Sequence, residues 1–162
     1  MSVFNEVIVA HEKAKAEAAS KEEKQLALQQ EKDAAFRKYF DEMVKELLLP
    51  VGAEFARDAE AYGFPSKINT KPDGDGNPYF SISLIPKKGA TFSDRYTNAD
   101  TVVFALQGLG GERKILVSSY FDQRSEHGVH KQRISPSDVT PDWFNAQLKG
   151  FLSKVLKTHD SN

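Results

Sequence analysis

The sequence predicts an α+β fold in which two amphipathic helices cover an antiparallel sheet. Three observations lead to this prediction. Apolar residues recur at steps of three and four between Ala34 and Phe64, which is the period of one helical face. Residues 66–134 then alternate apolar and polar side chains in short segments, as half-buried strands do. A second helical period follows Thr140 and completes the set of elements.

The first helix is expected to be long and to be kinked or broken near Pro50. Residues 12–33 are mostly Ala, Glu, Lys and Gln, which are strong helix formers. Pro50 cannot donate a backbone amide, so the helix kinks or restarts there, and Gly52 makes a bend easier. Gly63 followed by Pro65 is a conventional helix stop. We therefore expect the helix to end just before this pair.

Five short segments are expected to form an antiparallel β-meander, because parallel strands need long crossover connections. The densest turn signal is PDGDGNP at residues 72–78, and glycines near residue 110 punctuate a second turn. The last segment is the most polar and suits a sheet edge. The expected strands are residues 66–70, 79–85, 101–107, 113–121 and 127–134.

The C-terminal helix has a clear start. Thr140 suits the N-cap, Pro141 the first helical position and Asp142 the first turn. The helix is expected to pack on the sheet, on the same face as the first helix. Its expected buried stripe is Phe144, Leu148, Phe151, Leu152 and Val155.

Length and composition indicate one core. The chain has 162 residues with 40% hydrophobic content, which fits a single domain. Residues 11–35 contain only Leu26 and Leu28 as large aliphatic side chains, so they contribute little to that core. The predicted organisation is a polar helical arm at residues 1–35, a single α+β domain at 36–158 and a tail at 159–162.

The composition argues against several classes of function. The absence of cysteine removes disulfides, thiolate nucleophiles and cysteine-ligated metals. A net charge of -1 provides no general attraction to nucleic acid or to a membrane surface. No apolar run approaches the roughly 20 residues of a membrane span, and no basic leader precedes the apolar patch at residues 7–10. We therefore expect a cytoplasmic protein without a membrane partner.

One turn resembles a calcium loop in its spacing. Asp73, Asp75 and Asn77 are placed one, three and five, as in loops that wrap a hard cation. However, Pro78 stands where that loop needs glycine, and Leu84 stands where it needs a bidentate glutamate. Turn chemistry explains the same residues, so the sequence predicts a hairpin turn here.

No other pattern supports a cofactor, a metal or a catalytic centre. His127 and His130 are three apart on an expected strand, so their side chains face opposite sides. The glycines between Gln107 and Gly111 lack the Lys-Ser/Thr pair and the following helix that phosphate-binding loops need. We therefore predict that the protein is not an enzyme and has no cofactor.

The function that the sequence favours is that of a self-associating binding or adaptor protein. It is expected to form a homo-oligomer, to bind a protein partner, or both, through helical and sheet surfaces. The apolar helical surface is slightly larger than one sheet face needs, which motivates this prediction. The expected protein-interface residues are Phe36, Tyr39, Phe40, Met43 and Leu47.

Two alternatives remain open. The first is single-stranded nucleic-acid binding through the basic edge strand at residues 124–134, since basic residues interleaved with aromatics form such platforms. It is less favoured, because positive charge on an edge strand also prevents aggregation. The second is a small-ligand binder or enzyme with a pocket between sheet and helices. The nucleic-acid contacts of the first alternative are Arg124, His130, Lys131 and Arg133.

Overall fold

The computed structural model describes residues 2–92, 101–121 and 129–160. The chain divides into two compact units, Met1–Ala35 and Phe36–Asn162. The first unit is helical from Val3 onward and contains the beginning of helix α1 (Val3–Met43). All the other elements belong to the second unit.

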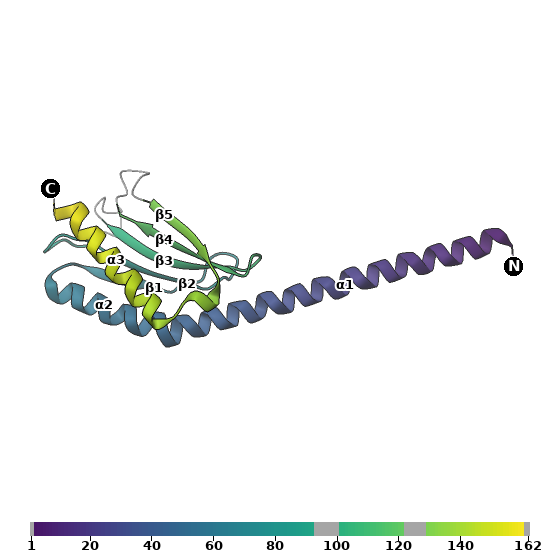
Figure 1. The fold of residues 1–162 in the computed structure, drawn as a ribbon, viewed down its shortest axis with the longest axis horizontal. Helices are drawn as coiled ribbons and strands as arrows, with labels where there is room; N and C mark the ends of the chain where they lie inside the picture. Colours follow the sequence, from purple (N-terminus) through teal and green to yellow (C-terminus); the bar gives the residue numbers. More distant parts are fainter. Residues whose placement is uncertain (1, 93–100, 122–128, 161–162) are drawn as a thin grey trace. The chain divides into compact units, whose positions relative to one another are not determined.

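The second unit has the α+β fold that the sequence predicts. Within the described ranges, helical elements, five strands and a short 3-10 turn before the last helix follow α1 in chain order (Figure 1). These elements are η1, a π-helix (Val44–Leu48), α2 (Leu49–Tyr62), β1 (Ser66–Asn69), β2 (Tyr79–Leu84), β3 (Val102–Leu109), β4 (Lys114–Tyr120), β5 (Val129–Ile134), η3 (Pro136–Asp138) and α3 (Pro141–Asp160).

The sheet is the predicted meander. Its strand order is β1-β2-β3-β4-β5, and every neighbouring pair is antiparallel. β5 lies at an edge, as its polar sequence predicts. β3 runs two residues further than expected, because Gly108 pairs with Ile115 and Leu109 with Lys114. The second glycine turn is therefore shorter than the sequence suggests.

The helix is not broken near Pro50 but changes to a π-helical turn just before it. The π-helical turn η1 directly precedes Pro50, and the α-helix resumes at Leu49 with proline in its first turn. A wider turn at this point accommodates a residue that has no amide hydrogen to donate. α2 ends at Gly63, whose φ of 105° only glycine adopts readily. The backbone amides of Gly63 and Phe64 donate to Glu60 O and Ala59 O, each at 2.9 Å.

Gly52 allows α2 to approach the sheet closely. A Cβ atom at this position would lie 2.6 Å from Cζ of Phe80, whose side chain is fully buried on β2. The role of this glycine is therefore close packing, whereas the sequence suggested that it eases a bend.

We expect Gly52→Ala to destabilise the protein, although alanine is the better helix former. The added methyl overpacks against Phe80, and such insertions cost about 1–3 kcal/mol, more than the roughly 1 kcal/mol gained in helix propensity. Gly150 of α3 is the matched control, because nothing lies within 4 Å of a Cβ added there. Gly150→Ala should stabilise by about 0.5–1 kcal/mol. Urea unfolding of both variants checks the prediction, and equal stabilisation by the two would contradict it.

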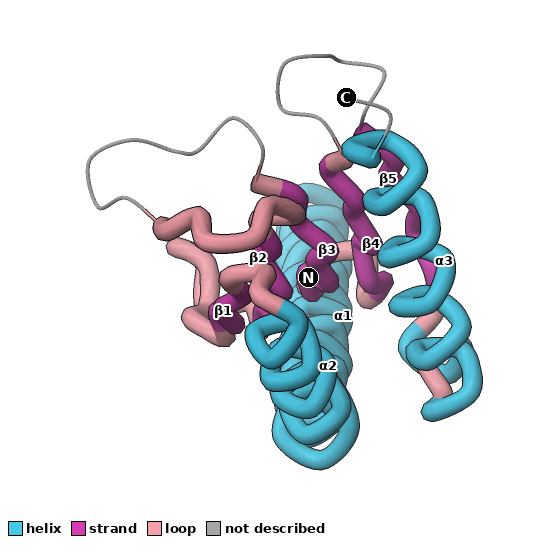
Figure 2. Tube along the Cα trace, turned by 90° about the vertical axis from the view of Figure 1, so that its left-hand side faces the viewer, coloured by secondary structure: helices cyan, strands magenta, loops and turns pink. Residues whose placement is uncertain are grey.

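The core lies on one face of the sheet. The helices that cover this face are the end of α1, η1, α2 and α3, and Figure 2 shows α2 and α3 as separate rods beside the strands. The N-cap of α3 is confirmed, since the amide of Trp143 donates to Oγ1 of Thr140 at 3.1 Å. The largest fully buried side chains include Phe40, Leu48, Phe80, Ile82, Leu84, Val102, Phe104, Leu106, Ile115, Phe144 and Val155.

Among the described residues, no helix combines the length and the apolar character that a membrane crossing needs.

Candidate binding surfaces

The predicted interface residues divide between the core and the surface. Phe36, Phe40 and Met43 are 6%, 0% and 8% exposed and belong to the core of the second unit. These three side chains are occupied within the chain, which corrects the expectation that they face a partner. Tyr39 is 50% exposed, and Leu47 is partly buried. The apolar residues do lie on one helical face, as their spacing predicts, but the core includes more of that face than expected.

The two remaining members of this set border an open hollow of about 380 Å³. Its walls include Tyr39 and Leu47 from the first helical segment, together with Val139 and Pro141 from the connection into α3. Glu42 and Glu46 also line it, which makes its rim acidic.

The face of the sheet opposite the helices is the second candidate surface, called here the open face. The strand register places on it a set of side chains that is half polar and half apolar. A row of small residues, Ser81, Ala105 and Ser118, crosses its centre. Larger side chains stand on either side of this row. The set is Tyr79, Ser81, Ser83, Val103, Ala105, Leu116, Ser118 and Tyr120.

The charge of the open face is uniformly positive along its strands. The five strands contain no Asp or Glu. Their Lys and Arg side chains all lie on the open face by the strand register, and they are Lys67, Lys114, Lys131 and Arg133.

The predicted nucleic-acid contacts are therefore only partly brought together. Lys131 and Arg133 share the open face, but His130 lies on the helix side of β5, because alternate residues of a strand face opposite sides. Arg124 lies outside the described residues. The period of two along a strand predicts this separation. The absence of acidic residues can be read directly from the sequences of the strands.

Polar contacts at the sheet rim hold two of these cations. Arg133 Nε donates to Glu112 Oε2 at 3.0 Å, and both side chains are more than half exposed. An exposed ion pair of this kind contributes little to stability. Lys114 Nζ donates to Ser135 Oγ at 2.8 Å. These contacts orient the cations without burying them.

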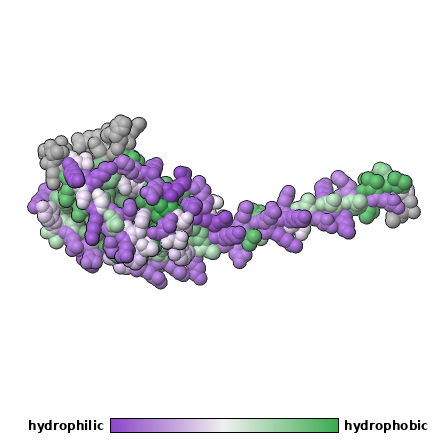
Figure 3. Space-filling view, viewed as in Figure 1, coloured by the Kyte–Doolittle hydropathy of each residue, from purple (hydrophilic) through white to green (hydrophobic). Residues whose placement is uncertain are grey.

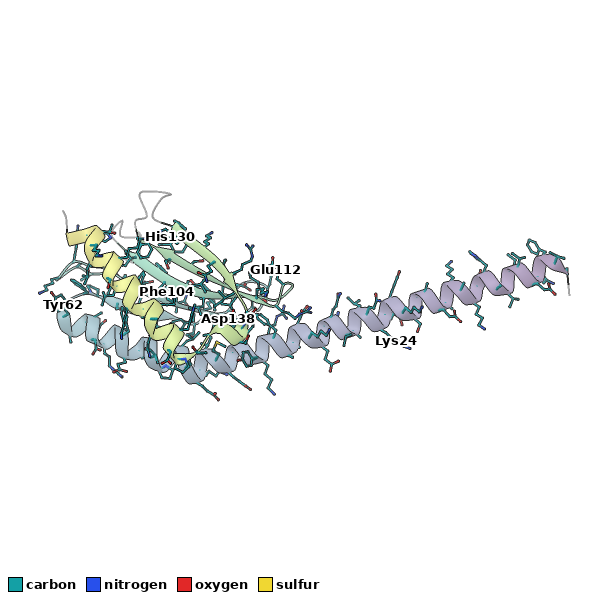
Figure 4. The ribbon with its side chains drawn as sticks, in the orientation of Figure 1. Lys24, Tyr62, Phe104, Glu112, His130 and Asp138 are labelled. Carbon is teal, nitrogen blue, oxygen red and sulfur yellow. The ribbon has the colours of Figure 1, made fainter. Side chains whose placement is uncertain are left out.

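His130 makes its contacts with α3 instead. Its Nε2 lies 2.8 Å from Nζ of Lys154, and its ring packs edge-on against Phe121 with centroids 5.5 Å apart. Because a lysine ammonium only donates, Nε2 is the acceptor in this pair. An open hollow of about 220 Å³ adjoins the pair and is also lined by Ser119 and Gly150. Figure 4 shows His130 on β5 near the end of α3.

The turn between β1 and β2 is organised by one carboxylate. Asp73 Oδ1 accepts from the amides of Asp75 and Asn77 at 2.9 and 3.0 Å. Its Oδ2 accepts from the side chains of Asn77 and Gln107 at 3.2 and 3.1 Å. The hydrogen bond from the Asn77 backbone amide, followed by the one from the Gln107 side chain, holds the pKa of the Asp73 carboxyl below its ordinary value. The turn chemistry predicted from the sequence is confirmed.

The Asp73 network predicts a pH dependence of stability. A carboxyl whose pKa is lowered on folding stabilises the protein above its unfolded pKa, and this contribution is lost as the pH falls through the folded pKa. Asp73→Asn should therefore lower the unfolding temperature at neutral pH, and the difference from wild type should shrink below about pH 4. Asp75→Asn is the control, because only its backbone amide joins the network. Thermal unfolding followed by circular dichroism from neutral to acidic pH checks this, and a difference that does not change with pH would contradict it.

The third surface is an apolar groove between α2 and α3, called here the helix groove. Its main hollow measures about 430 Å³ and adjoins a second one of about 260 Å³, with Phe55, Asp58 and Leu152 lining both. The sequence assigns Phe55 and Leu152 to buried stripes, but both are only partly buried. Tyr62 at the end of α2 is 61% exposed and also lines the groove (Figure 4).

The first turns of α1 form the fourth surface, called here the N-terminal patch. Val3, Phe4, Val7, Ile8 and Val9 are 77%, 72%, 61%, 41% and 62% exposed. Figure 3 shows a hydrophobic cluster at the N-terminal end of this helix. The short apolar run at residues 7–10 is the sequence signal for this patch, which is not among the interface residues predicted from the sequence.

Comparison of this chain with protein-family models, with curated proteins and with solved structures gives no match. Within the described part of the chain, no three His, Asp or Glu side chains are grouped so that they could hold a metal ion. The surfaces whose charge or apolar character suits binding are the positive open face, the helix groove and the N-terminal patch.

Proposed function

We propose that the protein is a non-catalytic binding protein that assembles with copies of itself through apolar helical surfaces. The observation that carries this proposal is the N-terminal patch, in which five large apolar side chains of one short helical stretch are 41% to 77% exposed. At about 100° per residue, Val3, Phe4, Val7 and Ile8 share one side of the helix, and Val9 lies on the other. A contiguous apolar patch such as the one these four form is typical of a contact site.

The expected affinity follows from the size of the patch. Full burial of a Val, Ile or Phe side chain is worth about 1.5–3 kcal/mol, so several of them offset an association cost of roughly 4–15 kcal/mol. The assembly is therefore expected to be weak to moderate and to form at micromolar concentration.

Sedimentation of the full chain over a range of micromolar concentrations tests the proposal. The average mass should rise above that of one chain as concentration increases. Because the contact is apolar, raising the salt concentration should not abolish it. A mass of one chain throughout the range would overturn the proposal.

A second candidate function is binding of single-stranded nucleic acid on the open face. The specific observation in its favour is that all four strand cations, Lys67, Lys114, Lys131 and Arg133, lie on this face and that the strands hold no acidic residue. Tyr79 and Tyr120 share the face and offer rings for base stacking.

Fluorescence anisotropy with a labelled oligothymidine tests this candidate. Binding should weaken steeply between about 50 and 200 mM salt, because phosphate contacts release counterions. The double variant Lys131→Ala with Arg133→Ala should weaken it further. Lys21→Ala with Lys24→Ala on α1 is the charge-matched control and should have no effect. Binding that is absent, or equally affected by both pairs, would remove this candidate.

A further inference from the structure

We infer that the N-terminal patch of one copy docks in the helix groove of a second copy. This inference rests on the proposed self-association and specifies its contact. Both surfaces are apolar and accessible, and every copy of the chain supplies one patch and one groove.

The groove exists because α2 and α3 leave part of their apolar stripes uncovered. The apolar stripe Phe36, Phe40, Met43, Val44 and Leu48 is buried in the core, but Phe55 and Ala59 on α2 are only partly buried. Leu152 and Leu156 on α3 are also only partly buried. A third apolar helix laid between them would complete the layer that covers the sheet.

The patch matches the groove in length and pattern. Val3–Val9 has seven residues, which at about 1.5 Å per residue spans about 10 Å of helix. The stretch of α2 that lines the main hollow, from Phe55 to Tyr62, rises by a similar amount. Phe4, Val7 and Ile8 recur at i, i+3 and i+4, the anchor spacing of a helix bound in a groove.

Charge gives the docked helix an orientation. At about 100° per residue, Glu6 flanks one margin of the apolar arc and uncharged Asn5 flanks the other. In its second hollow the groove carries Lys149 on the α3 wall and Glu54 and Asp58 on the α2 wall. The favourable arrangement places Glu6 along α3, near Lys149, and Asn5 along α2.

The contact joins two different surfaces, so it is heterologous. Each copy then donates one patch and offers one groove, and assemblies grow head to tail unless the rotation between copies closes a ring.

Site-directed cross-linking tests the docking directly, because the chain has no native cysteine. Val7→Cys and Tyr62→Cys chains are purified separately, given tags of different size, mixed and mildly oxidised. We expect a disulfide-linked heterodimer. A mixture of Leu26→Cys with Tyr62→Cys is the control, since Leu26 is 57% exposed on the same helix, and it should cross-link at least tenfold less.

A second measurement keeps the test independent of disulfide geometry. Phe4→Asp should weaken self-association by at least tenfold while leaving the unfolding midpoint unchanged, because Phe4 is 72% exposed. Leu26→Asp is the matched control and should leave association unchanged. Ala59→Arg, which fills the groove from its α2 wall, should weaken association as Phe4→Asp does.

The outcomes separate this inference from the proposal on which it rests. Assembly that is insensitive to Phe4→Asp, or a Val7→Cys chain that cross-links mainly to itself, would overturn the docking while self-association stands. A Val7→Cys, Tyr62→Cys double variant that closes within one chain at every dilution would also overturn it. A chain that stays monomeric would overturn both.

Discussion

Phe40→Ala is expected to lower the free energy of unfolding by about 3–5 kcal/mol, the usual cost of emptying a buried phenylalanine site. Phe40 is fully buried, and its ring stacks on that of Phe36 with centroids 6.4 Å apart. It also lies directly on β3, where a Cβ added to Gly108 would come within 3.2 Å of its Cδ1. The cavity left behind is lined by backbone and by packed rings, so it cannot collapse easily.

Tyr39→Ala is the control for this variant, because the neighbouring side chain is 50% exposed. Its cost should be about 0.5 kcal/mol or less, as for most surface substitutions. Urea unfolding of both variants measures the difference. If Phe40 served a partner surface instead, Phe40→Ala would change the assembly and leave the unfolding free energy close to that of Tyr39→Ala.

Phe104→Ala is also expected to lower the free energy of unfolding by about 3–5 kcal/mol. Phe104 is 1% exposed at the centre of β3 and joins the sheet to α3. Its ring centroid lies 6.3 Å from that of Phe144 and 5.7 Å from that of Phe151. Loss of these ring contacts adds to the loss of buried area. Hydrogen exchange should show weaker protection of α3 amides in this variant.

Val103→Ala tests the alternation of β3 beside it. Val103 faces the open side of the sheet and is only partly buried, so its loss should cost about 1 kcal/mol. Equal costs at positions 103 and 104 in urea unfolding would mean that both faces of β3 are packed, which would contradict the open face.

The candidate surfaces were predictable from the sequence to different degrees. Lys131 and Arg133 are two residues apart on β5, so the period of two places them on the same face and places His130 on the other. The helix groove was not predictable, because Phe55 and Leu152 have the same pattern as residues that are fully buried. Pattern shows which side of a helix is apolar, but not whether two neighbouring helices come close enough to cover each other.

The sequence by itself determined the elements, their order and the faces that they bury. Turn residues, the proline at position 50 and the glycine at 63 are local signals, and local sterics and hydrogen bonding act on them wherever the chain lies. The tertiary structure alone decided how far the sheet extends beneath the first helix, which placed Phe36 and Phe40 in the core. It also decided that Gly52 serves close packing. Both depend on distances between segments remote in sequence, where steric fit and not local periodicity determines the outcome.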